Sequence, residues 1–261
     1  MANAARSQIA SSFTNSKDAL IGESFAIFAS WDFALSKTEN LSKLRTENFI
    51  GAKSAGWLED LCKVFGRRYD PDTRDRALVY LAQKHCPLDI WKPILLWHLT
   101  RDEFLVRDFL MNWLFPAYEA GAFVIRPDAI HEHLRTVAQR GGVIKNDWKP
   151  SSIDKVSSTL IKIAADFGLL QGKHKKEFAS YHLPEESFLY LLHAMKEAQP
   201  NPRKLIESND WHLFLMRTEE VERELLRLHQ FRKLDYQVAG SIVQLGLPCK
   251  SALEYAERIV S

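Results

Sequence analysis

Short polar and basic side chains recur at helical spacing between residues 155 and 162. They are Lys155, Ser158, Thr159 and Lys162. A lysine ammonium group pairs with a phosphate, and a serine or threonine hydroxyl can bond a phosphate oxygen or a base edge. The set therefore predicts nucleic-acid contact, with these side chains facing a DNA groove.

A second basic group follows in a short polar turn. Lys173, Lys175 and Lys176 lie between a pair of leucines and Phe178, a pattern that predicts a β-hairpin with a cationic tip. Phe178, Tyr181 and Leu183 are expected in its returning strand. We expect the three lysines to contact the DNA backbone or the minor groove.

One helix must position the polar and basic side chains between residues 155 and 162. Its apolar side chains fall at steps of three and four and form one stripe: Ile153, Val156, Leu160, Ile163 and Phe167. Gly168 is expected to end the helix, because glycine enters the left-handed cap conformation without steric cost. A helix followed at once by a basic hairpin is typical of a winged helix. A surface amphipathic helix beside an ordinary hairpin is the alternative, since solvated lysines are common.

Three further cations, Lys53, Lys63 and Arg67, are expected on the outer face of a helix that Ser54 caps. Residues 37–68 carry seven Lys/Arg against four Asp/Glu. Short helices with a basic outer face can form a second helix-turn-helix-like unit. An ordinary solvated helical face explains the same pattern slightly better.

Composition restricts the class of protein. The chain has 261 residues, 46% hydrophobic, and a net charge of only +2, so nucleic-acid binding must come from local patches. Cys62, Cys86 and Cys249 are far apart and form no CxxC, which favours a reducing compartment over a disulfide framework. No run of about 18 apolar residues occurs. We expect a cytoplasmic protein without a membrane partner.

Motifs for catalysis or nucleotide binding are missing from the sequence. It contains no HExxH, GxxxxGK[ST] or GxGxxG. His131 and His133 stand two apart on a predicted helix, so they cannot share a metal ion. Pro71–Asp72 followed by Asp89 to Lys92 is one residue too long for a nuclease motif. We expect no enzyme, no cofactor, no metal and no small-molecule substrate.

The apolar periodicity predicts a mainly α protein. We expect a helical bundle with a helix-turn-helix-like N-terminal part and a central winged-helix unit that carries one small β-hairpin. The predicted segments are a flexible tail over 1–22, an N-terminal helical domain over 23–120, a winged-helix-like domain over 121–198 and a C-terminal helical extension over 199–261. That extension is expected to end in a pair of helices separated by Gly246 and Pro248. A group of large aromatic residues predicts the main core: Trp91, Trp97, Phe104, Phe109, Trp113 and Phe115.

Three stretches together resemble the BrxA family of BREX phage-defence systems. They are Glu47–Gly51 with the helix ending at Arg67–Tyr69, then Arg107–Leu110, then the helix and hairpin from Asp154 to Pro184. The resemblance covers roughly residues 24–195. It implies a mainly helical fold similar to the NusB class and a non-enzymatic, DNA-binding component. Such a component would act with the methyltransferase, ATPase and phosphatase-like proteins of its defence island. The DNA contacts it implies are Lys155, Ser158, Thr159 and Lys162 with the three lysines of the hairpin.

We therefore expect a double-stranded DNA-binding component of a phage-defence system, with the helix after Ser151 in the major groove. Two alternatives stay open. In one, the chain is a protein–protein adaptor whose hairpin and C-terminal helices dock other subunits. In the other, a NusB-like helical surface binds RNA.

Overall fold

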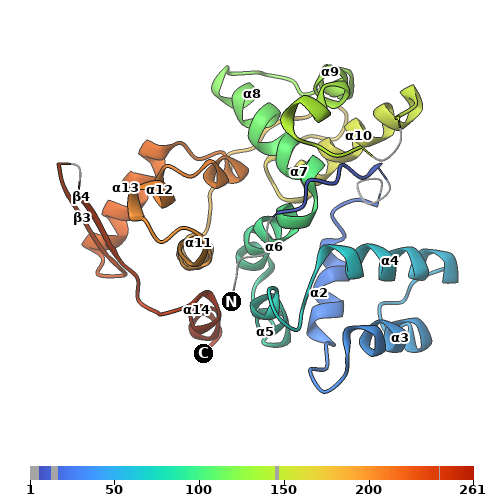
Figure 1. Cartoon of the computed structure of the whole chain (residues 1–261), viewed down its shortest axis with the longest axis horizontal. Helices are drawn as coiled ribbons and strands as arrows, with labels where there is room; N and C mark the ends of the chain where they lie inside the picture. Colours follow the sequence, from blue (N-terminus) through green and yellow to red (C-terminus); the bar gives the residue numbers. More distant parts are fainter. Residues whose placement is uncertain (1–5, 13–16, 145–146, 241) are drawn as a thin grey trace.

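The structure, a computed structural model, describes residues 6–12, 17–144, 147–240 and 242–261. The described chain is mainly helical, as predicted (Figure 1). The first group of helices is α2 (Ile21–Ala29), α3 (Lys37–Glu47), α4 (Ala55–Arg68), α5 (Arg76–Gln83) and α6 (Leu88–Asp102). The Ser54 hydroxyl accepts the Trp57 amide at 3.2 Å, so the predicted N-cap of α4 is confirmed. Helix α3 packs on α4, and α5 packs on both α2 and α6.

A continuous helical rod crosses the middle of the chain and leads into the predicted winged part. The rod is α7 (Phe104–Phe109), the π-helical turn η1 (Leu110–Leu114) and α8 (Phe115–Glu119). The following elements are η2 (Pro127–Ile130), α9 (His131–Arg135), η3 (Val137–Arg140), α10 (Pro150–Asp166), β1 (Leu170–Gln171) and β2 (Glu177–Phe178). Helix α10 packs against η2, α9, β1 and α7. Helix α7 of the rod and the short helices η2 and α9 thus pack against α10.

The C-terminal part contains a second hairpin, which corrects the expectation of a single one. Its elements are α11 (Glu185–Ala198), α12 (Pro202–Ile206), η4 (Asn209–Phe214), α13 (Thr218–Gln230), β3 (Asp235–Ala239), β4 (Ile242–Gly246) and α14 (Ala252–Ile259). Strands β3 and β4 pair antiparallel, with Tyr236 opposite Leu245. The predicted final pair of helices is wrong, because the β-branched residues Val238, Ile242 and Val243 favour strands. Helix α14 returns to pack on α5 and α11.

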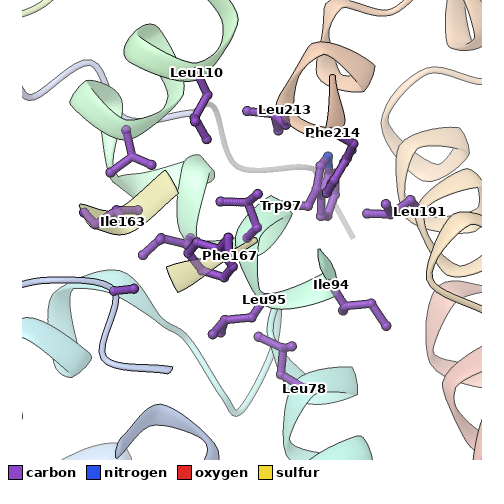
Figure 2. Close-up of a cluster of buried hydrophobic side chains, with 14 of the residues drawn as sticks. Leu78, Ile94, Leu95, Trp97, Leu110, Ile163, Phe167, Leu191, Leu213 and Phe214 are labelled. Atoms are coloured by element: carbon purple, nitrogen blue, oxygen red, sulfur yellow. The ribbon is translucent and has the colours of Figure 1, made fainter. Parts of the chain in front are cut away.

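The predicted aromatic core is confirmed. Trp91, Phe104 and Phe109 are buried, whereas Trp113 is only partly buried and stacks on Phe109. Figure 2 shows Trp97 of α6 among side chains from α5, η1, α10, α11 and η4. One cluster of buried hydrophobic residues therefore joins members of all three predicted helical segments.

Residues 6–12 are held against the body of the protein, although we predicted a flexible tail over residues 1–22. The Arg6 guanidinium donates to the Asp210 carboxylate, Nη1 to Oδ1 at 2.6 Å. The Ser7 amide donates to the Arg101 carbonyl at 2.8 Å, and the Ser7 carbonyl accepts from Arg107 at 2.8 Å. The two arginine contacts join residues 204 and 100 positions apart in the sequence, so a local pattern gives no sign of them. Residues 1–5 and 13–16 of the predicted tail lie outside the described residues.

Candidate nucleic-acid interface

The segment from Ile125 to Phe178, called here the winged unit, combines an extended residue, three short helices, a long helix and a hairpin. The Ile125 amide donates to the Lys176 carbonyl at 2.8 Å, which adds a third short strand position beside β2. Helix α10 begins with Pro150 at its first turn, where the missing amide costs nothing. It ends as predicted before Gly168, whose φ is +81°. The hairpin follows α10 directly, and β1 packs against α10.

The outer face of α10 carries three of the four predicted residues. Lys155, Ser158 and Lys162 are exposed. The Ser158 hydroxyl donates back to the Asp154 carbonyl at 2.8 Å and leaves its lone pairs toward solvent. The Lys162 ammonium pairs with the Asp18 carboxylate, and this bond raises the pKa of Lys162. Only Lys155 therefore offers a cation on this helix that no described residue neutralises.

The predicted position of Thr159 on the outer face is wrong, because this side chain is only 8% exposed. Its hydroxyl donates to the Lys155 carbonyl at 2.9 Å and is not available to a ligand. Thr159 follows Val156 by three positions and precedes Ile163 by four, so it borders the apolar stripe. The buried arc of α10 is also wider than that stripe and includes Ser157 and Ile161. Helices packed on two sides of α10 account for the extra burial.

The hairpin presents its lysines as a short wing. Lys173 and Lys175 are exposed, while Lys176 is partly buried and its ammonium donates to the Gly172 carbonyl. A Cβ on Gly172 would stand 2.1 Å from the Lys175 carbonyl oxygen, and φ there is +97°, so the turn requires glycine. The strands have two residues each and are shorter than predicted. Tyr181 lies beyond them in the segment that leads to α11.

The N-terminal cations also face outward. Lys53, Lys63 and Arg67 are exposed on α4 or just before it. Lys63 stands 3.5 Å from Glu59, and the Arg67 guanidinium donates to the Ser11 hydroxyl at 2.9 Å. They belong to a different element from the winged unit. Two adjacent residues nevertheless join α4 to α10, since Lys17 pairs with Asp60 of α4 and Asp18 pairs with Lys162 of α10.

Charge is concentrated on the winged unit. Residues 125–178 carry ten Lys/Arg against six Asp/Glu, whereas the rest of the chain carries 25 against 27. Our reading of single motifs missed three exposed cations of this unit, Arg126, Arg135 and Lys149. A running charge count would have found them. The nearly neutral chain thus hides a basic segment inside a slightly acidic remainder.

A buried carboxylate ties the winged unit to the central rod. Asp108 of α7 accepts from the Arg140 guanidinium at 2.9 Å and from the Asn112 amide at 2.8 Å. His133 Nε2 lies 2.8 Å from the same carboxylate. Burial alone would raise the pKa of Asp108, but the contacts from His133, Arg140 and Asn112 outweigh it and lower the pKa to about 2. Asp108 therefore stays charged and holds α9 and η3 in place.

The lowered pKa of Asp108 predicts a loss of stability at acidic pH. A folded-state pKa below the ordinary value of 3.8 stabilises the protein above that value, and the stabilisation disappears as pH falls toward 2. For Asp108→Asn we expect unfolding free energy to drop by about 2 kcal/mol at pH 6. The difference in unfolding free energy between the variant and the parent should be smaller by roughly 1 kcal/mol at pH 3 than at pH 6. Urea unfolding at both pH values measures this gap, and a constant gap would contradict the assignment.

Two features are absent from the described residues. No three His, Cys, Asp or Glu side chains within the described ranges gather so that they could hold a metal ion. Within the same ranges, no helix has the length and hydrophobicity needed to cross a bilayer.

Comparison with known proteins identifies the family. The family model BrxA matches residues 10–194, more than two thirds of the chain. No curated protein matches the chain. The resemblance seen in the sequence is confirmed, and the match ends before α12. The chain belongs to the BrxA family, which is generally considered non-catalytic, and this membership implies a component of a BREX phage-defence system.

Proposed function

We propose that the chain is a non-enzymatic component that binds double-stranded DNA through its winged unit and acts with other proteins of its defence system. Helix α10 would lie in the major groove, whose width admits one α-helix. The wing would contact the backbone beside it. The proposal includes a helix-turn-helix-like unit formed by the N-terminal helices.

One observation carries the proposal. Lys155, Lys173 and Lys175 are exposed on α10 and the adjoining hairpin, and none of them forms an ion pair with any residue that the structure describes. Several exposed cations elsewhere on the surface have acidic partners, such as Arg45 with Glu59 and Arg217 with Glu119. Cations without acidic partners are available to phosphates.

A salt titration tests the function directly. Fluorescence anisotropy of a labelled 25-base-pair duplex, at several salt concentrations between about 50 and 300 mM, should give a log K that falls with a slope steeper than about −3. Unlabelled single-stranded RNA of the same length should compete less well than unlabelled duplex. Absence of binding at the lowest salt would contradict the proposal. Stronger competition by RNA would favour the RNA-binding alternative instead.

The Asp18–Lys162 pair predicts unequal roles for the two lysines of α10. Because the Lys162 ammonium already has a carboxylate partner, Lys162→Ala should weaken duplex binding by less than about threefold. Lys155→Ala removes an unpaired cation and should cost about tenfold at 0.1 M salt. The same anisotropy titration compares them. Equal losses would show that DNA displaces Asp18 and that Lys162 is a full contact.

A further inference from the structure

Residues 17–20, called here the strap, run between helix α4 and helix α10. The Lys17 ammonium donates to the Asp60 carboxylate of α4 at 2.6 Å. The next residue, Asp18, pairs with Lys162 on the outer face of α10. The strap therefore places a carboxylate on the helix that we propose for the major groove.

The last two residues of the strap anchor it to the protein. Ala19 and Leu20 are buried. The Ala19 carbonyl accepts a hydrogen bond from the buried Arg68 guanidinium at 3.4 Å. None of these contacts involves the Asp18 side chain. The strap is therefore held in place by groups other than the Asp18 carboxylate.

The backbone of the strap passes twice through the left-handed region. The φ angle is +62° at Asp18 and +55° at Leu20. Aspartate enters this region more readily than most residues, whereas leucine rarely does. Such a conformation persists only where the surrounding structure enforces it. The burial of Ala19 and Leu20 supplies that constraint and fixes the path that directs Asp18 toward α10.

The pair of Asp18 with Lys162 is open to solvent, since the two side chains are 38% and 57% exposed. Solvent screens a pair of this kind, so it contributes little to the stability of the fold. Its position matters more. Lys155 and Lys162 stand seven positions apart and lie on the same side of α10. The Asp18 carboxylate thus occupies a cation on the same side of the helix as Lys155.

Two further acids lie near this end of α10. The bond to Asp18 raises the pKa of Lys162, and the charges of Asp166 and Glu23 add to that effect. Lys155, near the start of the same helix, forms no ion pair with any residue that the structure describes. The outer face of α10 is therefore basic at its start and neutralised toward its end.

We propose that Asp18 is an autoinhibitory group, whose carboxylate occupies the position on Lys162 that a DNA phosphate would otherwise take. Duplex DNA then contacts the start of α10 and the wing, and Lys162 contributes only when the charge of Asp18 is removed or displaced. This inference rests on the proposed binding of duplex by α10, and it adds a group that limits the affinity.

The substitution Asp18→Asn tests whether the carboxylate masks Lys162. Asparagine has nearly the same size and also tolerates the left-handed backbone, so the strap should keep its path. We expect the affinity of the full chain for the labelled duplex to rise about three- to tenfold at 0.1 M salt. The slope of log K against log salt should become steeper by about 0.9. An unchanged or lower affinity overturns the proposal.

A double variant separates masking of Lys162 from a general repulsion between Asp18 and DNA. Either effect makes Asp18→Asn bind more tightly, but only masking requires Lys162. Lys162→Ala should therefore cost about tenfold in the Asp18→Asn background, against less than about threefold in the parent. Equal losses in the two backgrounds overturn the proposal. A full gain from Asp18→Asn in the Lys162→Ala background also overturns it.

Glu207→Gln is the matched control. It removes the same charge from another exposed pair, Arg203 with Glu207, whose side chains are 44% and 51% exposed. The pair belongs to α12, which Figure 1 shows in the C-terminal part, away from α10. The control should change the affinity by less than about twofold. A gain as large as that of Asp18→Asn would mean that net charge alone acts, which overturns the proposal.

The same titrations separate this inference from the proposed function. If the parent binds duplex and Asp18→Asn gains nothing, the autoinhibition is wrong and the function stands. If the parent and every variant fail to bind at the lowest salt, both proposals are wrong. Binding by Asp18→Asn at a salt concentration where the parent does not bind supports both.

Discussion

Replacing Lys155, Lys173 and Lys175 together by alanine is expected to lower duplex affinity on the order of a thousandfold at 0.1 M salt. Each phosphate contact contributes about −0.9 to the slope of log K against log salt, which at 0.1 M amounts to about tenfold in affinity. Three lost contacts should also flatten the slope by about 2.7. All three side chains are exposed, so the variant should fold like the parent.

A variant with the same change of charge elsewhere is the decisive control for this result. Lys53, Lys63 and Arg67 are exposed as well, and replacing all three by alanine removes an equal number of cations. Because Lys63 and Arg67 already have partners on the protein, we expect a loss of less than tenfold. Equal losses in the two triple variants would mean that the charge of the whole molecule matters. A larger loss in the α4 variant would move the interface to the N-terminal helices.

The helix and wing were predictable because their signals are local. Ile153 to Phe167 follow the helical period, Gly168 supplies the left-handed cap and Gly172 the tight turn. Each of these depends on residues within one or two turns of the chain. The predicted outward position of Thr159 was wrong because the burial of this side chain depends on which helices flank α10. That arrangement is a property of the whole fold. The pairing of Lys162 with Asp18 is equally non-local, since 144 residues separate them.

A cleft between residues 179–183 and α13 could not be predicted from the sequence at all. Tyr118, Tyr181 and Met216 come from three separate segments, and each reads as an ordinary core residue in its own segment. The exposure of Phe123 has a local sign, because this residue stands between Gly121 and Pro127, where a helix cannot continue. The bridge that follows it pairs Ile125 with Lys176, which lies far along the chain. A pattern analysis of single elements has no access to such a bridge.

Buried charges were missed for a different reason. In the sequence, Arg68 counts only among the basic residues of 37–68 and in the family motif, yet Arg67 is exposed and Arg68 is fully buried. Arg68 lies three positions after Phe65 and seven after Leu61, on the apolar stripe of α4. The helical period therefore contained the signal. A charged residue on an apolar stripe indicates a buried partner, and that partner is Glu103 between α6 and α7.

Removing that partner should produce the largest loss of stability. The Arg68 Nε donates to Glu103 Oε1 at 3.0 Å, and the two side chains are 0% and 1% exposed. Glu103→Ala leaves a buried guanidinium without its carboxylate, so unfolding free energy should fall by about 3–5 kcal/mol. A double replacement, Arg68→Met with Glu103→Leu, removes both charges and fills the space with apolar groups. It should cost less than Glu103→Ala alone.

Urea unfolding followed by circular dichroism measures these differences. The matched control is Glu59→Ala, which breaks the Arg45–Glu59 pair on the surface, where the side chains are 38% and 42% exposed. Solvent screens that pair, so the control should lose less than about 1 kcal/mol. If Glu103→Ala costs no more than the control, the buried pair does not hold α4 to the junction of α6 and α7. If the double variant loses more than Glu103→Ala, the pair contributes net stability despite the cost of burying its charges.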